Sequence, residues 1–195
     1  MKNLLVTGFD PFGGASVNPA WEAVKLLPDV VGDCRIHKLM IPTVYGKAAD
    51  TAIKAAEDVC ADIVLSIGQA GGRAAVTPEL VAINHRNANG ADNEGNVILY
   101  STIIENAPAA YFATVPVRDM TAAIKDAGIA SAVSYSAGTF VCNDTFYTIS
   151  HRFDGSGVKV GFIHVPCIPE QVKEGRPSMP LCDIVKAITA AISVL

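Results

Sequence analysis

Leu4-Leu5-Val6-Thr7-Gly8 is a short apolar run that ends at a glycine, a pattern typical of a fully buried β-strand. A loop rich in Gly and Phe follows it, Gly8-Phe9-Asp10-Pro11-Phe12-Gly13-Gly14. Asn18 and Pro19 then supply an N-cap and a first-turn proline for a helix that extends to about Leu27. The chain therefore opens with a strand, a loop and a helix in succession.

The same alternation of strand and helix continues to the end of the sequence. Further strands are predicted at Ile36–Ile41, Ile63–Ile67, Val76–Ile83, Tyr111–Val115, Ala132–Tyr135 and Val158–Val165. Further helices are predicted at Tyr45–Val59 and Met120–Ala127, from close to Cys142, and from Ser178 or Pro180 onward. Such alternation predicts β-α-β units with right-handed crossovers, and hence an α/β fold with a mostly parallel sheet.

Length and composition favour one domain, spanning residues 1–195. Of these residues, 50% are hydrophobic, enough for one well-buried core and too few for two. Aromatic residues make up only 7%, while Ala, Val, Ile and Gly are abundant, which suits a buried parallel sheet covered by helices. No linker or internal repeat interrupts the chain. The polar stretch from His85 to Asn96 is expected to be a long loop, which in a compact domain is usually functional or mobile.

Charge and hydropathy exclude several classes of protein. A net charge of −4 gives no electrostatic footprint for nucleic acid or for an anionic membrane surface. The apolar run at the N-terminus is too short for a signal peptide and soon meets Asp10, and no apolar stretch is long enough to span a membrane. Five cysteines without CxxC spacing argue against a disulfide framework or a zinc site. We expect a cytoplasmic protein without a bound metal.

Cys142 is the first candidate for chemistry. It follows a turn of small residues, Ser136-Ala137-Gly138-Thr139, and lies among the first residues of a predicted helix. The helix dipole there favours a thiolate, and free backbone N–H groups could hold a developing oxyanion. The alternative is a buried, inert cysteine, the usual fate of an intracellular Cys.

His164 ends the strand Lys159-Val160-Gly161-Phe162-Ile163-His164, so it lies where the carboxyl ends of parallel strands gather. A histidine at that edge is well placed to deprotonate a thiol. The alternative is a structural histidine whose ring N–H donates a hydrogen bond to a backbone carbonyl. The other histidines are weaker candidates: His37 alternates along a strand, His85 lies in the polar loop, and His151 is late in a helix.

Glu79 is a carboxylate within the otherwise apolar run Val76–Ile83. Burial of an unpaired carboxylate is costly, so a buried Glu79 requires a partner. If that partner is an imidazole, the carboxylate would fix the imidazole in one tautomer. The alternative is a solvent-facing glutamate on an edge strand.

The loop from Gly8 to Gly14 lacks the glycine order of a dinucleotide-binding motif and the GK[ST] of a Walker motif. Phe9 and Phe12 in this Gly- and Pro-rich loop better suit a small, flat, apolar ligand. Alternatively, both rings cover the top of the core.

Four blocks of sequence combine these candidates in one order. The first is Val6-Thr7-Gly8-Phe9-Asp10-Pro11-Phe12-Gly13-Gly14 with Asn18-Pro19-Ala20-Trp21-Glu22, and the second is Gly68-Gln69-Ala70-Gly71-Gly72-Arg73 with Thr77-Pro78-Glu79. The third is Gly138-Thr139-Phe140-Val141-Cys142-Asn143, and the fourth is Gly161-Phe162-Ile163-His164-Val165-Pro166. Together they span about residues 4 to 170 and resemble the motifs of the pyroglutamyl peptidase I (pyrrolidone-carboxylate peptidase) family.

The resemblance implies a single three-layer α/β/α sandwich, no cofactor, and a cysteine peptidase that hydrolyses the amide bond after an N-terminal pyroglutamyl residue of peptides and proteins. It implies a catalytic triad of Cys142, His164 and Glu79. The positions that match the family's substrate pocket are Phe9, Phe12, Asn18, Thr43 (in Ile41-Pro42-Thr43-Val44), Gln69, Phe140 and Val141. Bacterial members of the family are commonly homotetramers, so the resemblance also implies a homo-oligomer.

The polar loop departs from the family pattern. In Ala88-Asn89-Gly90-Ala91-Asp92-Asn93, Asn89 stands where an arginine is expected and Gly90 where an aliphatic residue is expected. Arg86 is a candidate to replace that arginine in space. Two alternatives to the pyroglutamyl peptidase therefore stay open: a related thiol amidase with another substrate, and an impaired binder that retains the pocket. A nucleotide-binding protein is a more distant third, because no phosphate cradle is visible.

Overall fold

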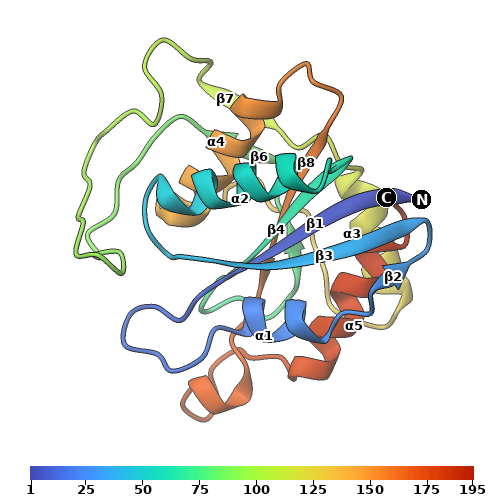
Figure 1. Ribbon diagram of the computed structural model, residues 1–195. Helices are drawn as coiled ribbons and strands as arrows, with labels where there is room; N and C mark the ends of the chain where they lie inside the picture. The colour runs from blue at the N-terminus through green and yellow to red at the C-terminus, as the bar shows by residue number, and fades with distance from the viewer.

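The computed structural model describes residues 1–195 and has a six-stranded central sheet with helices on both faces (Figure 1). The strands lie in the order β2 (Val30–Val31), β3 (Cys34–Ile41), β1 (Lys2–Phe9), β4 (Ile63–Gln69), β8 (Lys159–Val165) and β5 (Thr77–Pro78). The four long strands pair in parallel, and the two short edge strands pair antiparallel to their neighbours. The predicted α/β class with a mostly parallel sheet is confirmed.

The long central strands are apolar on both faces because helices cover both. Residues 4–9 of β1, residues 63–68 of β4 and residues 160–165 of β8 are all buried. A parallel strand buried on both faces needs a continuous apolar run rather than an alternating one. This is why Leu4–Thr7 and Ile63–Ile67 could be recognised as strands from sequence.

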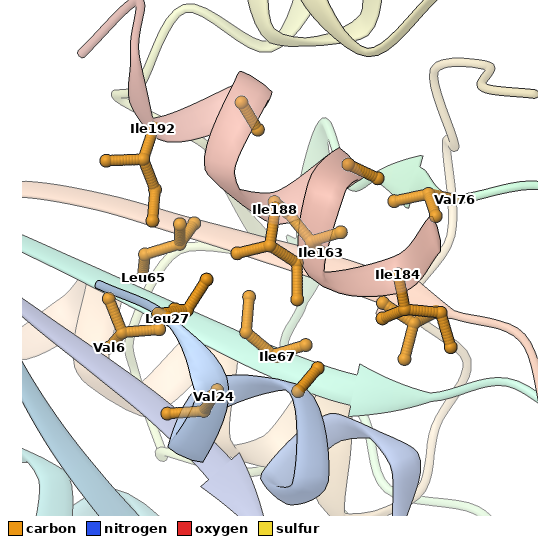
Figure 2. Packing of buried hydrophobic residues seen from close by; sticks show 14 of the residues in the cluster. Val6, Val24, Leu27, Leu65, Ile67, Val76, Ile163, Ile184, Ile188 and Ile192 are labelled. Atoms are coloured by element: carbon orange, nitrogen blue, oxygen red, sulfur yellow. The ribbon is translucent and has the colours of Figure 1, made fainter. Parts of the chain in front are cut away.

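Two groups of helices form the outer layers. α1 (Pro19–Leu26), α3 (Val117–Asp126) and α5 (Leu181–Ile192) cover one face, and α2 (Lys47–Asp58) and α4 (Val141–Phe153) cover the other (Figure 1). Figure 2 shows the first interface: Val24 and Leu27 together with Ile184, Ile188 and Ile192 pack against Leu65, Ile67 and Ile163 of the sheet. None of the helices has the length and hydropathy required to cross a bilayer.

The start of α1 positions the loop that follows β1. Asn18 is the N-cap, and its side chain accepts a hydrogen bond from the Ala20 backbone N–H, while Pro19 occupies the first turn. Gly8 lets α1 approach the sheet closely, because a Cβ atom there would lie 2.7 Å from Trp21 Cα. The loop from residue 10 to residue 17 is therefore held at both ends.

The middle of the chain differs from the prediction. The single strand expected at Val76–Ile83 is two short strands, β5 and β6 (Val81–Ile83), and β6 pairs antiparallel with β7 (Ala110–Phe112) in a separate sheet. Pro78 has no N–H to continue a ladder, which explains the break. The strand expected at Ala132–Tyr135 is absent.

That segment instead forms isolated bridges, from Ser131 to Val76 and from Ser134 to Glu79. Its neighbour at the sheet edge is a strand of only 2 residues, which offers too few partners for a regular ladder. The predicted loop is confirmed and is longer than expected, because no helix or strand occurs between residues 84 and 109.

Gly8→Ala should destabilise the fold by about 3 kcal/mol, because the added methyl group meets backbone rather than a movable side chain. Urea unfolding followed by circular dichroism measures this. Gly90→Ala is the matched control: a Cβ at Gly90 meets nothing within 4 Å, so its effect should stay within about 0.5 kcal/mol. Equal stability of the two variants would contradict the close approach of α1 to β1.

Candidate active site

A cavity of about 200 Å³ lies at the carboxyl ends of β1, β4 and β8. In an open α/β sheet this edge is where ligands bind. The cavity combines aromatic walls with one thiol, one imidazole and three uncharged polar side chains. Its lining consists of Phe9, Phe12, Asn18, Thr43, Gln69, Ala137, Phe140, Cys142 and His164.

Cys142 is the second residue of α4, and this helix begins without a side-chain cap. Its N-cap is Phe140, which cannot accept a hydrogen bond through its side chain. The backbone N–H groups of Val141, Cys142 and Asn143 consequently have no acceptor in the protein. The thiol thus lies beside free N–H donors at the positive end of the helix dipole.

Gly68 of β4 lies directly against the thiol. A Cβ atom at this position would lie 3.0 Å from Cys142 Sγ and 2.8 Å from the ring of Phe162. Only glycine therefore fits here without displacing the sulfur atom or the aromatic ring beneath it.

His164 is oriented by a buried carboxylate. Its Nδ1 lies 2.7 Å from Glu79 Oε1, and Glu79 is completely buried. The ring also packs against Phe162, with a centroid separation of 4.8 Å. With Nδ1–H donating to the carboxylate, Nε2 is the ring nitrogen available for proton transfer.

Arg73 is a third member of this network, to which the sequence analysis assigned no role. Its Nη1 donates to the same Oε1 atom of Glu79 at 2.7 Å, and its Nη2 donates to the carbonyl oxygen of Ser136. The guanidinium therefore joins the buried carboxylate to the turn that precedes α4. An arginine six residues before Glu79 in a Gly-rich turn was the signal available in the sequence.

Burial dominates the protonation of the thiol and the imidazole. It raises the pKa of Cys142 to about 12, with a further rise from Glu79 and a decrease from Arg73. Burial also lowers the pKa of His164, although Glu79 opposes this. For Glu79, burial acts to raise the pKa, but hydrogen bonds led by that of His164 outweigh it and the pKa is lowered. At neutral pH these shifts favour a neutral thiol, a neutral imidazole and a carboxylate.

The aromatic wall of the cavity comes from two segments, one with Phe9 and Phe12 and the other with Phe140. The rings of Phe12 and Phe140 lie 6.5 Å apart, and Tyr45 meets Phe140 edge-on at 5.4 Å. The side chain of Asp10 accepts a hydrogen bond from the Thr43 backbone N–H, and its carbonyl accepts one from Asn18 Nδ2. These bonds fix Asn18 and Thr43 relative to the loop that carries Phe12.

The structure brings most of the predicted site residues together. Phe9, Phe12, Asn18, Thr43, Gln69, Phe140, Cys142 and His164 line the cavity, and Glu79 lies behind His164. Val141 does not line it: its side chain is completely buried in the core between the sheet and the α2–α4 layer. His37, His85 and His151 also lie outside the cavity, and they contact Asn3, Tyr100 and Tyr111, respectively.

Asn89 and Gly90 are exposed and neither lines the cavity. Arg86 does not point to the cavity either. Its guanidinium pairs with Asp144, which is completely buried two residues after Cys142 in α4, and it lies over the ring of Tyr45. Arg86 therefore joins the polar loop to the helix that carries the thiol.

Further contacts tie the polar loop to the cavity. Buried Asp92 accepts hydrogen bonds from the backbone N–H groups of Tyr45, Glu94 and Asn96. Asn93 donates through Nδ2 to Asp10. No three His, Cys, Asp or Glu side chains lie close enough together to hold a metal ion.

A model of the pyroglutamyl peptidase family matches residues 2–195. The chain is 48% identical over 196 residues to the pyrrolidone-carboxylate peptidase of Lactobacillus johnsonii, covering 98% of this chain and 91% of that one. It is 50% identical to that of Staphylococcus saprophyticus, covering 98% and 92%. The crystal structure of Bacillus amyloliquefaciens pyroglutamyl peptidase I superposes with a TM-score of 0.96 at 43% identity, covering 100% of this chain and 96% of that one.

Arg86→Met should lower the free energy of unfolding by about 3 kcal/mol, because it leaves the buried Asp144 carboxylate without its cation. Arg152→Met is the matched control, since the Arg152–Glu57 pair is exposed and should give a much smaller loss. Chemical denaturation of both variants compares the two pairs. Equal losses would mean that the Arg86–Asp144 pair makes no special contribution.

Alkylation of Cys142 by iodoacetamide should accelerate about tenfold per pH unit from pH 7 to pH 10, because a pKa near 12 keeps the thiolate fraction small and rising throughout this range. Peptide mapping by mass spectrometry follows Cys142 separately from the exposed Cys60 and Cys182. A rate that is constant across this range would instead indicate a thiolate already formed at pH 7.

Proposed function

The chain belongs to the pyroglutamyl peptidase family, and we propose that Cys142, His164 and Glu79 are the triad with which it works. It is a cysteine hydrolase that removes an N-terminal pyroglutamyl residue from peptides. The observation that carries the assignment of the triad is that Cys142 and His164 line one small cavity while buried Glu79 holds Nδ1 of His164.

His164 accepts the thiol proton through Nε2 as Cys142 Sγ attacks the carbonyl carbon that links pyroglutamate to the next residue. Because burial favours the neutral thiol and the neutral imidazole, this proton transfer accompanies the attack. Glu79 stabilises the imidazolium that forms, and Arg73 keeps the carboxylate in position.

The free N–H groups at the start of α4 are the candidates for the oxyanion hole. They lie next to the nucleophile, and no protein acceptor occupies them. A developing negative charge on the carbonyl oxygen would receive hydrogen bonds and the favourable helix dipole together. His164 then donates its proton to the leaving amine, and water hydrolyses the thioester with His164 as the base.

The cavity suits a pyroglutamyl ring because the ring is small, flat and uncharged. No Asp, Glu, Lys or Arg side chain lines the cavity, so a free N-terminal ammonium would be buried there without a partner. Phe9, Phe12 and Phe140 cover the faces of the ring, while the amides of Asn18 and Gln69 and the hydroxyl of Thr43 serve the lactam group. Val141 contributes through its backbone N–H.

Asn89 and Gly90 favour neither of the alternatives drawn from the sequence. Both lie outside the cavity, so replacement of the expected arginine and aliphatic residue leaves the ring-binding walls intact. An altered substrate or a binder without turnover gains no support from these positions.

We further infer that residues 1–195 act as one domain, which forms a homotetramer in a reducing cytoplasm. The free thiols support a reducing compartment: all five cysteines are unpaired, and Cys60 and Cys182 are exposed. Exposed apolar side chains support the homotetramer, because contact between subunits would bury them: Phe112 is 66% and Tyr100 is 81% exposed.

Cys142→Ser should abolish release of coumarin from a pyroglutamyl-coumarin substrate, because a serine hydroxyl in this site is far harder to deprotonate than a thiol. The circular dichroism spectrum and thermal unfolding should match those of the wild type. Cys182→Ser, which changes an exposed cysteine away from the cavity, is the control and should keep full activity. Wild-type turnover by Cys142→Ser would overturn the assignment of the nucleophile.

A further inference from the structure

A second hollow adjoins the cavity and has no role in the mechanism above. It measures about 680 Å³ and lies between the loop after β1 and the segment after β8. Figure 1 shows these two segments at the same end of the molecule. We call this hollow the groove. Its lining consists of Phe12, Gly13, Gly14, Ala15, Ser16, Val17, Gln69, Cys167, Ile168, Glu170 and Gln171.

The groove and the cavity share two residues, Phe12 and Gln69, which form the boundary between them. The groove has more than three times the volume of the cavity that fits one pyroglutamyl ring. It is therefore large enough for several residues of an extended chain. The two shared residues make the hollows adjacent, which is the arrangement that a substrate occupying both of them requires.

Side-chain amides fix the two walls of the groove. Gln171 Nε2 donates to the Val17 carbonyl oxygen at 3.1 Å and to Gln69 Oε1 at 3.4 Å, while its Oε1 accepts from the Ile168 N–H. Gln69 in turn donates to Cys167 Sγ at 3.0 Å. The loop after β1 and the segment after β8 are thus held together by hydrogen bonds within the protein.

The chemistry of the site gives the direction of the substrate. If the ring lies in the cavity and its carbonyl carbon lies at Cys142 Sγ, then the leaving amine must lie near His164, which protonates it. The chain from His164 continues within three residues to Cys167 of the groove wall. The residues that follow the scissile bond therefore start at the boundary with the groove.

The groove also offers unpaired backbone groups to a peptide. The N–H and C=O groups of Gly13, Gly14 and Ser16 make no hydrogen bond within the protein. A bound peptide backbone can donate hydrogen bonds to such carbonyl groups and accept them from such N–H groups, regardless of its sequence. Side-chain preference then depends on the charged residues of the wall.

Glu170 is the one residue of the groove lining that is charged at neutral pH. It is exposed and has no Lys, Arg or His partner within ion-pair distance. Its carboxylate therefore gives the groove a negative charge that a basic substrate side chain could pair with.

We propose that this groove binds the residues that follow the pyroglutamyl group and that Glu170 makes the enzyme prefer basic side chains among them. The inference rests on the proposed function, since the ring must occupy the cavity for the following residues to reach the groove. It identifies the favoured substrates as peptides with an N-terminal pyroglutamyl group followed by Lys or Arg.

The test compares kcat/KM for two peptide amides, pyroglutamyl-Lys-Lys-Ala and pyroglutamyl-Glu-Glu-Ala, in the wild type and in charge variants. The ratio within one enzyme cancels any general change in activity. The wild type should favour the lysine peptide about threefold, as expected for a solvent-exposed ion pair. Glu170→Gln should bring the ratio near one, and Glu170→Lys should invert it. Glu174→Lys, in the same segment but outside the groove lining, should retain the wild-type ratio.

A steric variant tests the groove independently of charge. Ser16 is exposed and its side chain makes no hydrogen bond, so Ser16→Trp should fold normally and fill the groove. Its KM for both peptide amides should rise several-fold more than its KM for pyroglutamyl-coumarin, which has a single leaving group.

The outcomes distinguish failure of the groove from failure of the proposed function. Equal ratios in the wild type and Glu170→Lys, or equal KM changes for short and long substrates in Ser16→Trp, overturn the groove and leave the triad untouched. Failure of the wild type to cleave any of the three substrates overturns the proposed function itself.

Discussion

The completely buried carboxylate of Glu79 is the constraint on which the arrangement of the site depends. A charge without solvent needs partners, and those of Glu79 come from three segments: His164 from β8, Arg73 from the turn after β4, and the side chain of Ser134. The short strand β5 serves this purpose. It pairs antiparallel with the end of β8 and thereby delivers Glu79 to the imidazole. At the β5 edge, the short strand and the isolated bridges replace a regular ladder because they hold Glu79 in place.

The same requirement explains how far the fold could be predicted from sequence. The long parallel strands were predicted close to their observed bounds, because burial on both faces imposes a continuous apolar run. The start of α1 was predicted from its N-cap Asn18 and from Pro19. β5 and β6 were predicted as one strand, and Ala132–Tyr135 was wrongly predicted as another. These segments are shaped by partners far away in the chain, such as Ser134 and Phe162, whose carbonyl groups accept from Leu80 and Glu79. Local periodicity holds no information about such partners.

For the site, each predicted residue gave a weak signal alone, and the order of four blocks made the combination specific. Eight of the ten predicted positions line the cavity, and Glu79 lies behind it. The bond of Arg73 to Glu79 and the pairing of Arg86 with Asp144, 58 residues away, were not predicted. A buried acid in a helix identifies a need for a cation but not which of several arginines meets it. Val141 was predicted from its position in a motif, and its side chain proves to belong to the core.

The uncapped start of α4 has a consequence for the stability of the protein. A missing side-chain N-cap costs a helix about 1 kcal/mol, and here no protein group accepts a hydrogen bond from the first N–H groups of α4. A ligand that places an oxygen atom beside the first N–H groups of α4 accepts their hydrogen bonds when it binds. Ligand binding and folding are thereby thermodynamically linked. A bound molecule of this kind raises the free energy of unfolding, so the protein resists heat and denaturant better with it than without it.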